Sequence, residues 1–327
     1  MTLQRVAVIS DVHGNAPALA AVLDEIGGLD VDLIVSCGDL FAGPLPNEAA
    51  ALLTPLGDRV RYVRGNADRE VATVYDGGTT EFDGPRHAGS VLTAEHRALL
   101  DTFAPTVLIS VDGLGDVCCC HGTPTSDETI LTYLTPDERL AAELSGAPAP
   151  TVIGGHTHMQ VDRTAGGVRY VNAGSVGMPY EGVPGAYWAL LGPDVEHRRT
   201  EYDLASATGA ILASGMPAAE VFAAEYVASS HPREETARRS SRPRSHSTRR
   251  ASRRGWRRPV SSATTSGRRF SRASRSPPRG PARSGCARSG RRSRTRPSSA
   301  RRAATAPRSR PRCSRPCSGS RASAACT

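Results

Sequence analysis

The sequence changes character abruptly near residue 236, and this break limits how much of the chain can form a packed core. Residues 237–327 contain 28 arginines, no aspartate, no glutamate and few large apolar side chains. Such a segment cannot bury enough apolar surface to offset the entropy lost on ordering. We therefore predict a disordered tail rich in Arg, Ser, Pro and Ala over residues 237–327, with the folded part confined to residues 1–236.

The net charge of +9 combines two segments of opposite sign. Residues 1–236 carry 13 arginines against 32 acidic residues, so the tail alone makes the chain basic. Arginine-rich tails can bind RNA by neutralising phosphates, which makes nucleic acid a candidate partner only if the tail is genuine. The chain also lacks lysine, as a very GC-rich gene would encode. A frameshift in such a gene would yield a similar irregular mixture, so the tail is either a functional segment or a frameshift product.

The cysteines and the apolar runs indicate the compartment. Cys118, Cys119 and Cys120 are adjacent, and successive strand residues point to opposite faces, which disfavours a disulfide within the triplet. We expect reduced thiols and a cytoplasmic protein. No apolar run approaches the roughly 20 residues of a membrane span, so no membrane partner is expected.

Short apolar runs bounded by Gly, Asp or Pro predict the strands. These runs are Val6–Ile9, Leu33–Val35, Val60–Val63, Val107–Val111, Val117–Cys120, Val152–Ile153, Val168–Val171 and Tyr187–Leu191. Helices are expected over residues 17–26, 47–56, 137–146, 204–213 and 217–227. An α/β fold, a four-layer α/β/β/α sandwich of two mixed sheets, fits this order. We expect a catalytic domain over residues 1–203, with the helices of residues 204–230 packed on the same domain.

Potential metal ligands follow the predicted strands at five places. They are Asp11 and His13, then Asp39, then Asn66, then His121, and finally His156 and His158. Because strand ends converge in space, these side chains are expected to meet. Residues two apart in extended backbone face the same side, which predicts a pincer from Asp11 with His13 and another from His156 with His158. Carboxylate oxygen and imidazole nitrogen suit manganese, iron, zinc or nickel.

The blocks DVHGN, GD, GNAD, HG and GHTH occur in this order, each behind a predicted strand. Each block alone is a weak signal of a metal site. Together, over residues 5–200, they resemble the calcineurin-like metallophosphoesterase superfamily, in particular its small prokaryotic phosphodiesterases. A glycine adjoins the ligands of every block, as loops that meet at one point require.

The resemblance implies two divalent metal ions, with manganese expected and iron, zinc or nickel as alternatives. The implied ligands are Asp11, His13 and His158 for one metal, Asp39 as the bridge, and Asn66, His121 and His156 for the second. Asn66 and His121 are thereby also implied as catalytic residues. The implied reaction is hydrolysis of phosphate mono- or diesters by in-line attack of a metal-bridging hydroxide. The expected substrate is a small phosphorylated molecule, a nucleotide or a phosphodiester.

Two departures from the family pattern leave alternatives open. Many members have a histidine directly after the asparagine of the third block, where this chain has Ala67. The next residue, Asp68, is either a catalytic general acid or a helix cap. The phosphate-binding arginine that protein phosphatases of the superfamily place after the bridging aspartate is also absent, and Arg64 is a candidate to supply that charge. Asn15 is a candidate to hydrogen bond near the site.

The regions between the ligand blocks, residues 69–92 and 123–133, are expected to form the rim that faces the substrate. Two other classes of function stay open. One is a catalytically inactive interaction scaffold with the metallophosphoesterase fold, although an intact ligand set favours the enzyme. The other is an RNA-binding protein that acts through its basic tail.

Overall fold

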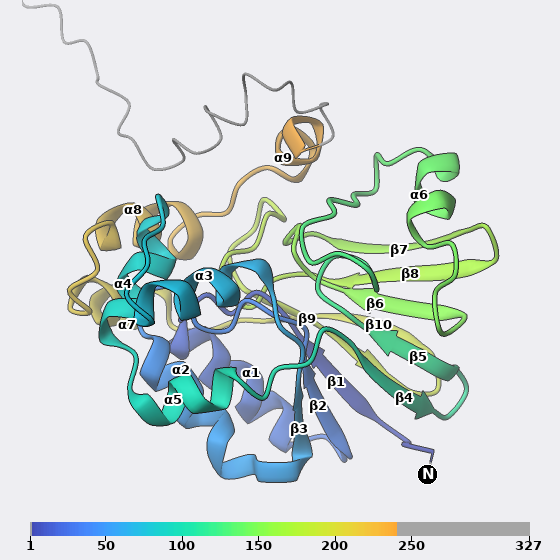
Figure 1. The fold of residues 1–327 in the computed structure, drawn as a ribbon, viewed down its shortest axis with the longest axis horizontal. Coiled ribbons are helices and arrows are strands. Elements are labelled where there is room, and N and C mark those ends of the chain that lie inside the picture. Colours follow the sequence, from blue (N-terminus) through green and yellow to red (C-terminus); the bar gives the residue numbers. More distant parts are fainter. Residues whose placement is uncertain (1, 241–327) are drawn as a thin grey trace, which may run out of the picture. The chain divides into compact units, whose positions relative to one another are not determined.

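Two mixed five-stranded sheets form the centre of the fold in the computed structural model, which describes residues 2–240 (Figure 1). The first sheet has the order β10 (Val195–Thr200), β9 (Ala186–Leu191), β1 (Val6–Ile9), β2 (Leu33–Ser36) and β3 (Val60–Tyr62). The second has the order β4 (Val107–Val111), β5 (Gly115–Cys119), β6 (Thr151–Gly154), β8 (Val168–Ala173) and β7 (Gln160–Ala165). In the first sheet β1, β2 and β3 are parallel and β9 and β10 pair antiparallel at one end. In the second sheet the parallel strands β5, β6 and β8 lie between the antiparallel edge strands β4 and β7.

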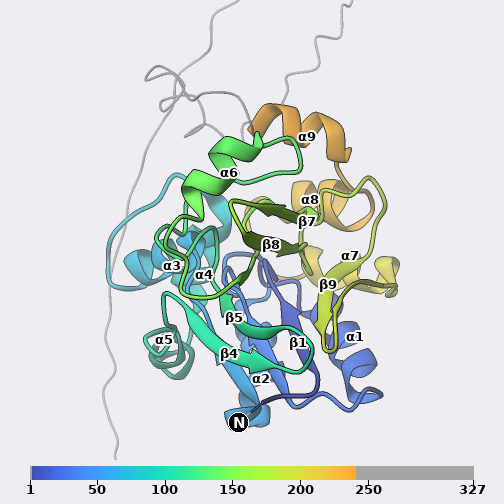
Figure 2. The same cartoon turned by 90° about the vertical axis from the view of Figure 1, so that its right-hand side faces the viewer.

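Helices cover the outer faces of the two sheets. The helices are α1 (Ala16–Gly27), α2 (Pro46–Leu53), α3 (Asn66–Tyr75), α4 (Asp83–Val91), α5 (Ala94–Leu100), α6 (Asp137–Glu143), α7 (Leu204–Leu212), α8 (Ala219–Phe222) and α9 (Arg233–Ser240). A 3₁₀ helix spans Thr54–Arg59, and a π-helix spans Ala223–Val227 directly after α8. Helices α1 and α2 pack on the first sheet, and α6 lies beside β7 and β8 of the second (Figures 1 and 2).

Three apolar layers separate the helices and sheets, as alternation along single strands requires. In β1, Ala7 and Ile9 face the helix side, whereas Val6 and Val8 face the second sheet. In β5, Cys119 lies between the sheets and Cys118 faces α6. The predicted four-layer sandwich is confirmed, and the cysteines of the described residues are buried and free.

The described residues end in α9, which runs past residue 237, where the tail was expected to begin. Ala237 is buried, and Arg233 pairs with Glu181 at 3.0 Å, so this segment is attached to the domain. The predicted disorder and RNA binding concern residues 241–327, which lie outside the described residues. Within residues 2–240, no helix has the length and apolarity needed to cross a membrane.

Candidate metal centre

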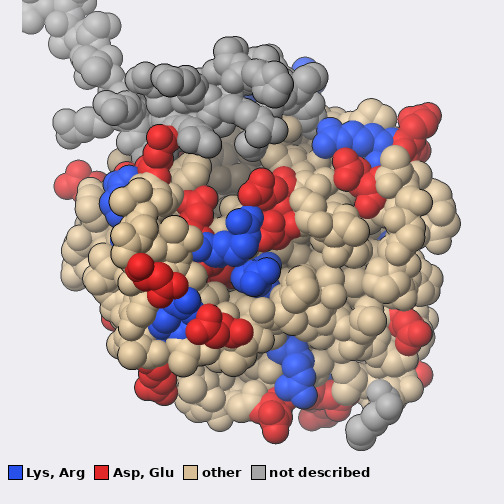
Figure 3. All heavy atoms as spheres, viewed as in Figure 1, with Lys and Arg blue, Asp and Glu red and all other residues tan. Residues whose placement is uncertain are grey.

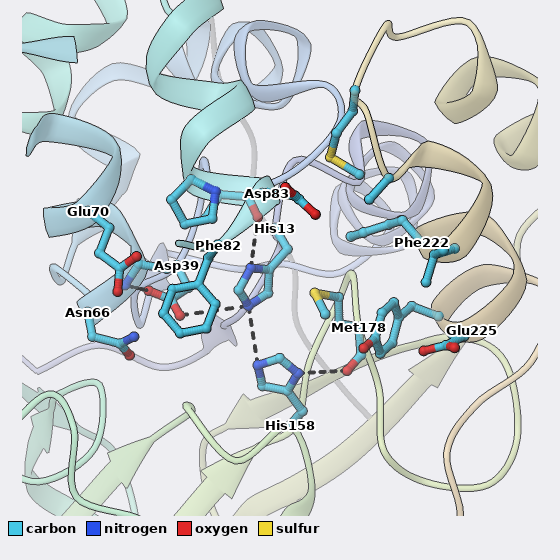
Figure 4. Close-up of a pocket in the computed structure, with 18 of the residues that line it drawn as sticks. His13, Asp39, Asn66, Glu70, Phe82, Asp83, His158, Met178, Phe222 and Glu225 are labelled. Carbon is cyan, nitrogen blue, oxygen red and sulfur yellow. Dashed lines mark hydrogen bonds and ion pairs between the residues drawn. The ribbon is translucent and has the colours of Figure 1, made fainter. Parts of the chain in front are cut away.

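The structure brings together the seven residues that the sequence analysis predicted as ligands. Each comes from a loop at the carboxyl end of a strand: β1 for Asp11 and His13, β2 for Asp39, β3 for Asn66, β5 for His121, and β6 for His156 and His158. Figure 4 shows His13, Asp39, Asn66 and His158 converging from these loops. The sequence analysis therefore predicted correctly that the side chains after these strands lie close together; this does not yet show that they bind metal.

Two groups of donor atoms lie close enough to share a cation. In the first, the Nε2 atom of His158 lies 3.1 Å from Asp11 Oδ1 and 3.2 Å from His13 Nε2. In the second, the Nε2 atom of His121 lies 3.4 Å from Asp39 Oδ2 and 3.2 Å from Asn66 Oδ1. Asp39 Oδ2 also lies 3.7 Å from His13 Nε2, which places this carboxylate between the two groups.

Backbone carbonyls fix the orientation of three of the histidines. The Nδ1 atoms contact carbonyl oxygens: His13 that of Ala42 at 3.1 Å, His121 that of Cys37 at 2.8 Å, and His158 that of Met178 at 2.8 Å. A carbonyl only accepts, so Nδ1 must carry the hydrogen and Nε2 presents a lone pair in the neutral ring. Metal-binding histidines typically donate the N–H of their other ring nitrogen to such an acceptor.

The hydrogen bonds of Asp11 also indicate whether a cation fits this site. Its Oδ2 atom accepts hydrogen bonds from the Ser10 hydroxyl at 2.6 Å and from the His156 amide at 2.8 Å. Its Oδ1 atom is buried without a hydrogen-bond partner and faces the Nε2 atoms of His158 and His13. When these rings are neutral, a buried carboxylate oxygen without a hydrogen-bond donor opposite imidazole lone pairs is costly without a cation, and the donors therefore fit a divalent metal.

Five of the seven residues have left-handed backbone: Asp11 (φ 51°), His13 (φ 47°), Asp39 (φ 55°), His156 (φ 68°) and His158 (φ 59°). They are the non-glycine residues with positive φ in the described part of the chain. Strained backbone of this kind clusters at functional sites. The backbone at these residues is therefore not extended, contrary to what the predicted pincers assumed. Asp11 and His13 still lie in one donor group, whereas the pairing of His156 with His158 is wrong. His158 faces His13, whereas the ring of His156 lies 5.0 Å from that of His121.

Two glycines let these loops approach one another. A Cβ atom on Gly38, which has φ +99°, would lie 2.5 Å from the Nδ1 atom of His121. A Cβ atom on Gly155 would overlap the Ser10 hydroxyl and Asp11 Oδ2. The glycines beside the ligands thus permit close contact, as the sequence analysis expected.

The electrostatic field of the site is negative. Burial raises the pKa of Asp11, but the neighbouring His158 outweighs it and lowers that pKa to about 2. Burial lowers the pKa of His121, but the Asp39 carboxylate and then Asp11 raise it to about 10. A field that holds a proton this firmly also attracts a divalent cation.

Asp68 holds the loops of the site instead of facing a ligand. Its Oδ2 atom accepts N–H bonds from Asp39 at 2.8 Å and Gly65 at 3.0 Å, and its Oδ1 atom accepts them from Leu40 and Phe41. Burial, and then the charge of Asp39, raise its pKa to about 7, a value that would suit a general acid. However, Asp68 is fully buried and does not line the cavity described below, so its contacts match the helix-cap interpretation.

We expect Asp68→Ala to lower the free energy of unfolding by about 3 kcal/mol or more, because four buried N–H groups lose their acceptor. Asp68→Asn retains one acceptor oxygen and should lose less. Urea denaturation measures both, with Asp24→Ala on the exposed face of α1 as the control, expected within about 0.5 kcal/mol of the parent chain. Unchanged stability, combined with loss of one limb of the pH–rate profile, would instead assign a general acid to Asp68.

The two weaker candidates lie away from the ligands. Asn15 caps α1, accepting from the Ala18 amide at 3.3 Å and donating to the Gly177 carbonyl at 3.2 Å. Arg64 is exposed and does not line the cavity. Neither residue lines the cavity, so both roles stay predictions.

A cavity of about 480 Å³ opens beside the donor groups. Its lining includes His13, Asp39, Asn66, His156 and His158, together with Glu70, Phe82, Asp83, Gly84 and Pro85 from the expected rim of residues 69–92. The described residues 123–133 do not line it. The opposite wall comes from Met178, Tyr180, Met216, Ala218, Val221, Phe222, Glu225 and Tyr226, which the sequence analysis did not single out. Their apolar pattern had indicated only helices that complete the core.

Comparison with known proteins agrees with this geometry. Residues 5–192 match the calcineurin-like phosphoesterase superfamily domain. The uncharacterized protein MJ0912 of Methanocaldococcus jannaschii is 28% identical over 244 residues, covering 66% of this chain and 96% of that protein. A metallophosphoesterase from Sphaerobacter thermophilus has 28% identity and a TM-score of 0.55, covering 68% of this chain and 97% of its own. The hypothetical protein PH1004 from Pyrococcus horikoshii OT3 shares the fold at 20% identity, with a TM-score of 0.61 over 70% of this chain and 100% of its own.

Proposed function

The chain belongs to the calcineurin-like phosphoesterase superfamily, and on this premise we propose that it hydrolyses phosphate mono- or diesters with two divalent metal ions. The observation that carries the proposal is the arrangement of the donor atoms. The Asp11 Oδ1 atom, which has no hydrogen-bond partner, and the Nε2 atoms of His13 and His158 face one another across distances that a cation can bridge.

In this proposal each donor group holds one metal. Asp11, His13 and His158 would hold the first metal, Asn66, His121 and His156 would hold the second, and Asp39 would be shared by both. Manganese is the expected metal, with iron, zinc or nickel as alternatives, because the donors are carboxylate and amide oxygens and imidazole nitrogens. When bound, two such cations supply Lewis acidity, a lowered pKa for water and a clamp for the phosphoryl group.

The protein's own groups prepare this site for the reaction. The amide of Ala67, in the first turn of α3, donates to Asp39 Oδ1 at 2.9 Å. This bond and the positive end of the helix dipole orient the carboxylate, so that Oδ2 stays directed at His13 and His121. The Nδ1–carbonyl bonds fix the histidine rings in the same way, and the donors need not reorganise when substrate binds.

Binding of the phosphate itself must rely on the metals. Among the described residues no arginine lines the cavity, and the chain has no lysine. Arg69, a nearby basic residue, is paired with Asp127 at 2.7 Å and with Glu128 at 2.9 Å. Phosphate affinity without metal should therefore be negligible, because the cavity is then acidic.

The direct test is a metal-varied activity screen on the full chain. The protein is stripped with a chelator, reconstituted separately with Mn, Fe, Zn and Ni, and assayed for hydrolysis of bis-p-nitrophenyl phosphate. We expect activity only after reconstitution, with two metals per chain by elemental analysis. Two bound metals without hydrolysis of any phosphate ester would favour the scaffold, and failure to bind metal would contradict the proposal.

Within this function, we expect simple phosphodiesters to be cleaved at least as well as phosphopeptides. The reasons are the missing phosphate-binding arginine and the Ala67-Asp68 sequence where many members of the family have a histidine. The measurement compares kcat/KM for bis-p-nitrophenyl phosphate with that for a phosphoserine peptide at the same metal loading. Strong phosphopeptide activity with inert diesters would overturn this expectation.

A further inference from the structure

Apart from the donor residues and three carboxylates, the cavity lining is largely apolar. Phe82 and Pro85 line one side, and Met178, Met216 and Phe222 line the other. Figure 4 shows Phe82 beside His13 and Asp39, with Met178 and Phe222 across the cavity. A phosphate ester held at the metals would place its organic part between these two walls.

The wall of residues 216–226 is built around aromatic contacts and an unusual helix. Tyr180 stacks on His158 with ring centroids 4.8 Å apart, and Phe222 packs against Tyr226 at 5.6 Å. Helix α8 widens into the π-helix Ala223–Val227, a form frequent at functional sites. Burial raises the pKa of Tyr226 to about 12, so its phenol stays neutral near pH 7.

Apart from the donor residues, the charged groups that line the cavity are acidic. They are Glu70, Asp83 and Glu225. Asp83 pairs with Arg86 at 2.6 Å and Glu225 lies 3.6 Å from His231, but neither partner lines the cavity. Glu70 accepts a hydrogen bond from the Thr80 hydroxyl, and burial raises its pKa. On the face seen in Figure 3, acidic and arginine side chains alternate without a continuous basic surface for a polyanion.

We propose that the cavity takes a phosphate ester whose organic part is apolar and neutral or cationic, and that it rejects a second anionic group. The inference rests on the proposed function, since the metals must hold the phosphoryl group. Apolar walls favour a desolvated ring or chain, whereas a second anion would be desolvated beside carboxylates, with no cationic side chain among the lining residues of the described part of the chain. Nucleoside polyphosphates and dinucleoside polyphosphates are thereby excluded as good substrates.

The first experiment compares three monoesters: phenyl phosphate, 4-carboxyphenyl phosphate and 4-(aminomethyl)phenyl phosphate. In each, hydrolysis forms a bond from phosphorus to the water oxygen and breaks the bond to the phenol oxygen, which leaves and takes a proton. The manganese-loaded full chain is used, and phosphate release is measured. We expect kcat/KM to be about tenfold or more lower for the carboxyphenyl ester than for the other two.

Variants on the cavity wall test the cause of this preference. Val221 lines the cavity and is 37% exposed, so Val221→Lys should fold and should raise kcat/KM for the carboxyphenyl ester severalfold. Glu225→Gln should act in the same direction. The matched controls are Leu212→Lys, at an exposed apolar residue of α7 outside the cavity, and Glu220→Gln on α8, which should leave the preference unchanged.

A binding measurement separates failure of this inference from failure of the proposed function. Calorimetry on the manganese-loaded chain compares benzylphosphonate with methylphosphonate and 4-carboxybenzylphosphonate. We expect benzylphosphonate to bind about tenfold or more tightly than either. That order without hydrolysis of any ester would support the cavity assignment and contradict the enzyme. Hydrolysis or binding with no preference among the three groups would overturn the inference and leave the phosphoesterase proposal intact.

Discussion

Replacing Asp39 with asparagine is expected to remove metal and activity together. The carboxylate lies between the two donor groups, with Oδ2 at 3.4 Å from His121 and 3.7 Å from His13. The asparagine amide oxygen can still accept the hydrogen bond from the Ala67 N–H, so the fold should survive. The substitution removes the negative charge that both cations would share. We expect kcat/KM for bis-p-nitrophenyl phosphate to fall on the order of 10³-fold, with metal content falling in parallel by elemental analysis.

Asp24→Asn is the control for this experiment, since it makes the same chemical change at an exposed position of α1. It should keep both metals and normal turnover. Circular dichroism should show the same secondary structure for both variants. Two metals per chain and near-normal turnover in Asp39→Asn would contradict the assignment of this residue as the bridge.

Gly155→Ala should damage both the fold and the metal centre. The added methyl group would overlap the Ser10 hydroxyl and Asp11 Oδ2, which are already hydrogen bonded at 2.6 Å. The loop after β6 must then move, and it carries His156 and His158 with it. We expect a loss of about 2 kcal/mol or more of unfolding free energy and of most of the metal affinity, measured by denaturation and by metal titration.

Gly209→Ala provides the matched control because a Cβ atom there meets nothing within 4 Å and the residue lies inside α7. This change should stabilise the chain by roughly 0.5–1 kcal/mol, as expected for alanine in a helix. Full metal affinity in Gly155→Ala would show that the loops after β1 and β6 can separate without harm to the site.

Much of the fold could be predicted because its central strands are fully buried. The runs that became β1, β2, β6 and β9 are continuously apolar and bounded by turn residues. The edge strands β7 and β10 were missed because adjacent charged residues, Asp162-Arg163 and Arg198-Arg199, interrupt any apolar run in them. Helices α3, α4 and α5 were not among the predicted helices. Residues 69–92, which include most of α3 and all of α4, were assigned to the rim, and residues 94–100 were assigned to no element.

The identity of the candidate ligands could be predicted from the sequence, but the local geometry of the site could not. The spacing of Asp and His residues behind strands identified the seven side chains, but it gave the wrong local geometry for His156 and His158. The role of Asp68 depended on backbone amides from another loop, Leu40 among them, which no local pattern reveals. The cavity wall was hidden for a similar reason. Phe222 and Tyr226 look like core residues in sequence, and only the tertiary fold turns them toward the ligands.

The left-handed backbone at Asp11, His13, Asp39, His156 and His158 also restricts which ligand types these loops can carry. Aspartate, asparagine and histidine enter that region several times more readily than other residues with a Cβ atom, and β-branched residues hardly do so. Redesign of the centre toward thiolate ligands would therefore require new loops as well as new side chains. Asn66 and His121 lie outside this restriction, so ligand exchange should be tolerated first at these two positions.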